Sequence, residues 1–72
     1  MLTSDLIRIA VAGGGLRIDC AKHLVPDIIR IVTAAGRDGG LIILENTINI
    51  QTSDKIRIAA AGKGHVLFND TV

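Results

Sequence analysis

Residues 3–10 read TSDLIRIA and residues 52–59 read TSDKIRIA, so one eight-residue motif occurs twice with a single internal difference. A third, degenerate copy, PDIIRIV, occupies residues 26–32. Each copy is followed by glycines and then by an apolar stretch. Self-similarity of this kind predicts that the chain consists of three copies of one supersecondary unit.

Each copy begins with residues that favour the start of a helix. Thr3 and Thr52 can act as N-caps, and Pro26 suits the first helical position. An acidic residue recurs where the helix dipole favours negative charge. These residues are Asp5, Asp27 and Asp54. The glycines that follow are typical of helix ends, and we interpret the apolar stretches at 16–20, 41–45 and 65–69 as strands.

The predicted fold is therefore α/β, with three α-β repeats in a single domain. We place the repeats at 3–21, 25–46 and 52–70. Strands separated by helices are parallel and joined by right-handed crossovers. The continuous apolar run LIIL at 41–44 is typical of a central strand, whereas residues 16–20 alternate. This favours the order 1-2-3 with all helices on one face, a solenoid-like arrangement, over the order 2-1-3 with helices on both faces.

One face of such a sheet has no helix to cover it. Aligned on the glycines, the helix-facing positions are Leu16, Ile18, Leu41, Ile43, His65 and Leu67. The opposite positions are Arg17, Asp19, Ile42, Leu44, Val66 and Phe68. We interpret the four apolar residues Ile42, Leu44, Val66 and Phe68 as an interface with a second copy or another protein. The alternatives are a one-residue register error in the third strand and a sheet covered on both faces.

Two further features offer contacts outside this face. The first and third strands would expose unpaired backbone groups, so edge-to-edge pairing is a second route to a dimer. Residues 45–50 alternate polar and apolar side chains and could prolong the central strand. The other interpretation is a loop whose Ile48 and Ile50 tuck under the third helix.

The size of the chain also indicates a partner. With 72 residues, 49% of them apolar and only Phe68 aromatic, it can build one small core. Cys20 is the only cysteine and cannot form an intramolecular disulfide. Together with the two histidines, His23 and His65, it supplies too few ligands for a structural zinc site. A partner subunit is the remaining support, so we expect a homodimer or a protein complex.

Charge and glycine patterns argue against the common anion-binding classes. Eight basic and seven acidic residues give a net charge of +1, so nucleic acid is a weak expectation as partner. The glycines follow helices rather than precede them, which is the reverse of a phosphate-binding loop. The alternative function is a regulator that binds nucleic acid or another polyanion through an outward row of Arg8, Arg30 and Arg57. Each has an aspartate three residues earlier, and a local ion pair is the simpler interpretation.

Little in the chain suggests catalysis. Cys20 and His23 are close in sequence, but no third group or oxyanion-binding motif accompanies them. We expect no catalytic residue, no metal, no cofactor and no small-molecule ligand. The N-terminus has no pattern of a secretory signal, and no apolar run reaches the length of a membrane span. With a lone cysteine, this favours a cytoplasmic protein.

Residues 41–46 (LIILEN), followed by Ile48 and the helical stretch 56–61 (IRIAAA), resemble one β-α leucine-rich repeat. The asparagine of that pattern is Asn46, whereas Ala21 and Asp70 occupy the equivalent places in the other repeats. The resemblance covers about one repeat and serves as an analogy of architecture. In that family the exposed face of the sheet binds partners, which implies the same face here. The sequence thus predicts a small non-enzymatic module that acts through protein association.

Overall fold

Helices and strands alternate along the chain, as the three motif copies predict. The computed structural model describes residues 2–69. Its elements are α1 (Thr3–Val11), β1 (Leu16–Asp19), the 3-10 turn η1 (Cys20–Lys22), α2 (Val25–Asp38), β2 (Ile42–Glu45), α3 (Thr52–Gly62) and β3 (Val66–Phe68). Residue 70, with which the third predicted repeat ends, lies outside the described residues.

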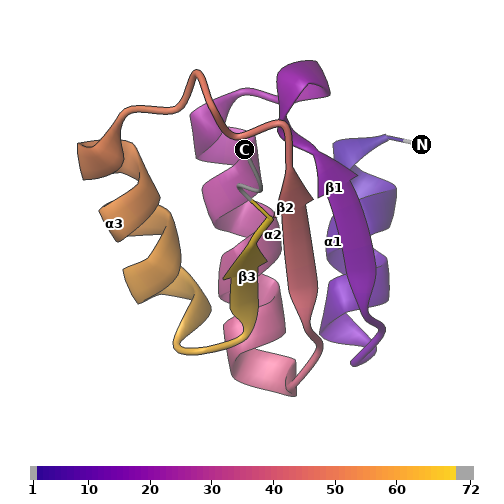
Figure 1. The fold of residues 1–72 in the computed structure, drawn as a ribbon. Helices are drawn as coiled ribbons and strands as arrows, with labels where there is room; N and C mark the ends of the chain where they lie inside the picture. The colour runs from indigo at the N-terminus through magenta and orange to yellow at the C-terminus, as the bar shows by residue number, and fades with distance from the viewer. Residues whose placement is uncertain (1, 70–72) are drawn as a thin grey trace.

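The strands form one open parallel sheet in the order β1-β2-β3, so the predicted order is confirmed. Leu16, Ile42 and Val66 lie side by side across it, and Ile18, Leu44 and Phe68 form the next such row. The helices lie behind the sheet in Figure 1, in the same left-to-right order as the strands that follow them. Helix α2 packs against both α1 and α3. The result is a layer of helices on one face of the sheet, and none of the elements within residues 2–69 lies on the other.

The helix starts differ from prediction at the N-caps. Leu2 and Gln51 have extended backbones and occupy the N-cap positions without a side-chain capping bond, while Thr3 and Thr52 are the first helical residues. The prediction of threonine caps is wrong by one residue, because the Leu2 and Gln51 carbonyls already accept the first helical hydrogen bonds. Pro26 lies in the first turn of α2, at the second helical position and not the first, because the helix starts at Val25.

The glycines have two roles rather than one. Gly39 is the left-handed C-cap of α2, as expected, with φ of 90°. Gly36, expected to end that helix, lies inside it. A Cβ atom on Gly36 would be 2.9 Å from the carbonyl oxygen of Gly62 and 3.0 Å from that of Ala61. Gly36 is therefore the point at which the α2 backbone approaches the end of α3. The left-handed C-cap of α3 is Lys63 and not a glycine.

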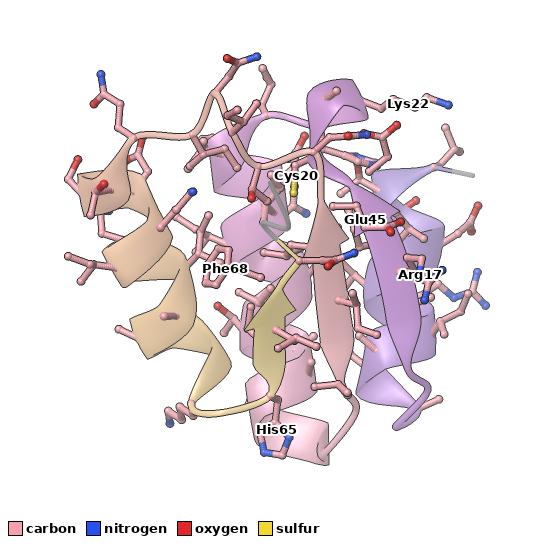
Figure 2. The ribbon with its side chains drawn as sticks, in the orientation of Figure 1. Arg17, Cys20, Lys22, Glu45, His65 and Phe68 are labelled. Atoms are coloured by element: carbon pink, nitrogen blue, oxygen red, sulfur yellow. The ribbon has the colours of Figure 1, made fainter. Side chains whose placement is uncertain are left out.

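The core lies between the helices and the sheet, and it corrects the predicted interface. Ile42 and Leu44 are completely buried in it, and Val66 and Phe68 are partly buried and pack against it. Figure 2 shows Phe68 on the side of β3 that faces α3. The assignment of these four residues to the uncovered face is wrong. The one-residue shift considered for the third strand is what the structure has, and it applies to β2 as well.

The cause of the shift is the unequal length of the repeats. Leu16 starts β1 eleven positions after Asp5, but Val66 starts β3 twelve positions after Asp54, because α3 extends to Gly62. Helix α2 is longer still and runs past Gly36, so β2 starts at Ile42 and not at Leu41. Since side chains alternate between the faces of a strand, a displacement by one residue moves every side chain to the other face.

The segment after β2 is a loop, which is the second of the two interpretations given for residues 45–50. Ile50 packs against the core, as predicted for a residue tucked under α3. Ile48 does not, because its side chain is 78% exposed. The strand does not continue beyond Glu45, since the left-handed backbone of Asn46, with φ of 58°, turns the chain away from the sheet.

Candidate interaction surface

The face of the sheet opposite the helices carries a small apolar patch, which we call the open face. On β2 it presents Ile43, with Leu41 immediately before the strand, and on β3 it presents Leu67. Leu67 is 53% exposed and Leu41 is 46% exposed, while Ile43 between them is half-buried. The register places Ile43 directly beside Leu67. The patch is thus continuous across the two strands.

Charged and polar side chains border this patch on β1 and at the carboxyl ends of the strands. Arg17 lies beside Ile43 on the β1 side. Its Nε atom is 3.8 Å from Oε1 of Glu45, and both side chains lie in front of the sheet in Figure 2. The amide of Asn69 donates to Oε2 of the same carboxylate at 3.4 Å. The Arg17 side chain is 68% exposed, so its guanidinium stays open to a further partner.

Sequence reasoning assigned Leu41, Ile43 and Leu67 to the core and so missed this patch. A signal was present in the polar residues that follow them. Glu45 follows Ile43 by two residues and therefore lies on the same face of β2. Asn69 follows Leu67 by two residues, directly after β3. Because an unpaired charge is costly to bury, Glu45 indicates which face of β2 meets solvent.

The carboxylate of Asp19 lies at the end of β1, on the open face, and is hydrogen-bonded. Oδ1 of Asp19 accepts hydrogen bonds from the Asn46 side chain at 2.9 Å and from the Ala21 backbone at 3.0 Å. These two bonds, the Asn46 amide first, hold the pKa of Asp19 below its ordinary value, with a smaller contribution from Lys22 and His23. The bonds tie the end of β1 to the loop after β2.

Removing the Asn46 amide is expected to raise the pKa of Asp19. Glycine is the suitable replacement because it adopts the left-handed backbone of residue 46 without strain. Since the folded-state pKa is depressed, the contribution of Asp19 to stability is present above its unfolded pKa and is lost as the pH falls through the folded one. Asn46→Gly should therefore weaken the dependence of stability on pH below about pH 4.

The measurement is an NMR titration of the Asp19 carboxyl carbon. Asn69→Ala serves as the control, because the Asn69 amide contacts Glu45 and not Asp19. An unchanged Asp19 pKa in Asn46→Gly would show that the Asn46 bond does not hold the carboxylate.

The predicted row of arginines lies on the helices, away from the open face. Arg30 is 3.5 Å from Asp27 and Arg57 is 3.2 Å from Asp54, so two of the three expected local ion pairs form. Arg8 makes no such pair with any residue in 2–69. Arg30 also lines a shallow hollow of about 300 Å³ between α1 and α2, together with Arg37 and apolar residues of both helices.

Thr47 follows β2 and is the one buried residue whose side-chain hydroxyl makes no hydrogen bond within residues 2–69. Valine has nearly the same shape and no hydroxyl. Because an unpaired buried hydroxyl costs free energy, Thr47→Val is expected to raise the free energy of unfolding by about 1 kcal/mol. Urea unfolding measures the change. Thr33→Val is the control, since the exposed Thr33 hydroxyl already donates to the Ile29 carbonyl; an equal gain there, or a loss for Thr47→Val, would contradict the prediction.

The residues considered for catalysis and metal binding lie elsewhere. Cys20 is buried at the start of η1, on the core side, and His23 is partly exposed at its end. Among residues 2–69 no three histidine, cysteine or acidic side chains are grouped so that they could hold a metal ion. None of the helices in that range combines the length and the apolar character needed to cross a bilayer.

The chain was compared with protein-family models, curated proteins and solved structures, and it matches none of them.

Proposed function

We propose that this chain is a small non-enzymatic module of the cytoplasm that acts by protein association, and that it binds a second copy of itself through the open face. The observation that carries the proposal is the exposure of Leu41 and Leu67 on either side of Ile43. They belong to a sheet face that no helix of the described residues covers (Figure 1). Apolar residues that adjoin one another on a surface and are bordered by polar side chains are typical of interaction sites.

The energetics support a partner on this face. Full burial of a leucine or isoleucine side chain contributes roughly 1.5 to 3 kcal/mol, and these side chains are about half-buried in the single chain, so each would gain on the order of 1 kcal/mol. A second copy would bury the three residues of both chains. The free energy of unfolding of a domain of this length is only about 4 to 11 kcal/mol. Association through the open face therefore adds a large share to the stability of a chain that has one thin core.

The geometry favours the face of the sheet over its edges. Strand β1 has four residues and β3 has three, so either edge offers few backbone groups for pairing with another chain. The solenoid-like interpretation agrees with this choice, because three α-β units stacked side by side present one continuous sheet surface. Proteins of that kind use such surfaces for binding.

Sedimentation equilibrium over a range of concentrations tests the proposal. The wild-type chain is expected to pass from monomer to dimer, and Leu67→Asp is expected to weaken the dimer at least tenfold, because it would bury a carboxylate in the apolar contact between the copies. Ile56→Asp is the matched control, since Ile56 is 64% exposed on α3, away from the sheet. A wild-type chain that stays monomeric, or a dimer that loses the same affinity in both variants, would refute the proposal.

The second candidate is binding of nucleic acid or another polyanion by Arg8, Arg30 and Arg57. The observation that favours it is that two arginines of α2, Arg30 and Arg37, line the same hollow. Binding of a mixed-sequence RNA at increasing salt distinguishes the two candidates, because phosphate contacts weaken steeply as salt rises. The second candidate would be established if the chain binds RNA in a salt-dependent way, if the triple variant Arg8→Ala/Arg30→Ala/Arg57→Ala loses this binding, and if Leu67→Asp keeps it.

A further inference from the structure

Resting on the proposed self-association, we infer that the two sheets cross at about a right angle and that Arg17 of each copy meets Glu45 of the other. The inference concerns the orientation of the partner and the residues that determine it. Sheets that pack face to face either align, with an angle of about 30°, or cross at about 90°. The charges of the open face decide between these arrangements.

The register makes the open face a grid of three strands by three rows. Ile43 is its centre, with Arg17 beside it on β1 and Leu67 beside it on β3. Along β2, Leu41 precedes Ile43 by two residues and Glu45 follows by two. Neighbouring strands lie about 4.8 Å apart, and residues two apart on a strand lie about 6.6 Å apart. The steps across the sheet and along it are therefore similar in length.

A symmetric dimer needs a two-fold axis in the plane between the two faces. If the axis runs along the strands through Ile43, Glu45 lies against the Glu45 of the other copy. If it runs across the strands, Arg17 lies against the other Arg17. Both of these aligned arrangements bring like charges together and form no pair of opposite charges between the two copies.

A diagonal axis crosses the two sheets, and one of the two diagonals matches the charges. It passes through Asp19, Ile43 and the position of His65, and it exchanges the position of Arg17 with that of Glu45. Two Arg17–Glu45 pairs then form across the interface. The other diagonal places Arg17 against Leu41 and Glu45 against Leu67, which pairs neither charge.

The same diagonal also matches the apolar residues. It sets Leu67 of one copy against Leu41 of the other, so the two most exposed apolar side chains of the open face cover each other. Ile43 packs on its own copy at the centre. Asp19 faces its own copy at one corner, and this is the one pair of like charges in the arrangement, set against two Arg17–Glu45 pairs. Each Asp19 carboxylate is bonded within its own chain to Asn46 and to the Ala21 backbone.

Exchanging the two charges tests the crossing. Arg17→Glu/Glu45→Arg keeps an opposite-charge pair within each chain and restores both pairs between two identical variant chains. The variant is expected to form homodimers with nearly wild-type affinity. Mixed with wild type, it would place arginine on arginine and glutamate on glutamate. Native mass spectrometry of an equal mixture should therefore show heterodimers at well below the statistical half.

The single variants complete the design. Arg17→Glu and Glu45→Arg should each lower the affinity of self-association about tenfold, and mixing the two should restore it, because both contacts between them are attractive. Circular dichroism verifies that each variant is folded. Heterodimers of wild type with the double variant at half of the population or above would overturn the crossed arrangement, because aligned sheets would favour or tolerate them.

The crossing and the proposed function fail in different ways. If Leu67→Asp abolishes self-association while the double variant mixes freely with wild type, the open face is the interface and the crossing is wrong. If Leu67→Asp leaves self-association intact, the proposed function and the crossing are both wrong.

Discussion

Leu44→Asp is expected to unfold the protein at neutral pH, whereas Leu67→Asp is expected to leave the isolated chain folded. Both leucines lie in the sheet, on neighbouring strands and one position apart in register. They differ in the face that they occupy. Leu44 is completely buried between the sheet and the helices, while Leu67 is 53% exposed on the open face.

The expected size of the Leu44 effect follows from two contributions. Loss of a buried leucine side chain costs about 2 to 5 kcal/mol. An unpaired carboxylate in the core adds a desolvation penalty, and the total is comparable to the whole stability of about 4 to 11 kcal/mol. Circular dichroism with thermal unfolding at low protein concentration measures both variants. A folded Leu44→Asp together with an unfolded Leu67→Asp would show that the two faces are exchanged.

Gly36→Val is expected to lower the free energy of unfolding by about 3 kcal/mol. The added side chain would begin 2.9 Å from the Gly62 carbonyl oxygen, where α2 and α3 approach each other. The atoms in the way are the backbone carbonyl oxygens of Gly62 and Ala61, which cannot move as the end of a flexible side chain can. The helices would have to separate, and the core beneath them would open.

The control for Gly36→Val is Ala60→Val, a β-branched substitution at an exposed position of α3. It carries the helix-propensity cost of valine, about 0.5 kcal/mol, without a clash. Urea unfolding of the two variants separates packing from propensity. Equal losses of stability would mean that the approach of α2 to α3 at Gly36 is not tight.

The repeated motif was sufficient to predict the architecture. TSDLIRIA and TSDKIRIA form equivalent parts of α1 and α3. PDIIRIV lies in α2, starting at the second residue of that helix. The apolar run 41–44 identified the central strand, because a strand between two others is covered on one face and flanked on both edges. The parallel pairing of the strands followed from the helices between them and from right-handed crossovers, whereas the order of the strands rested on the apolar run.

The faces of β2 and β3 could not be predicted by aligning the glycines. That alignment assumes equal helix lengths, but Gly36 lies inside α2, which continues to Asp38, and α3 includes Gly62. A local count of residues cannot reveal this, since it depends on how closely α2 approaches α3. The polar residues Glu45 and Asn69 were the better guide, because their side chains identify the solvent face whatever the helix length.

Local electrostatics were partly predictable, and long-range contacts were not. The pairs Asp27–Arg30 and Asp54–Arg57 follow from helical spacing alone. The bond between Asp19 and Asn46 joins residues 27 positions apart and depends on the left-handed backbone of Asn46. Arg17 and Glu45 likewise meet only because β1 and β2 pair in the observed register.

The central claim is that the open face is where two copies of this chain meet. A dilution series of methyl-labelled protein followed by NMR tests it most directly, since it reports the position of the contact as well as its existence. The methyl signals of Leu41, Ile43 and Leu67 are expected to shift with concentration, while those of the core residues Ile28 and Ile58 stay constant. Signals that do not change at any of the three, or changes confined to the helices, would contradict the account.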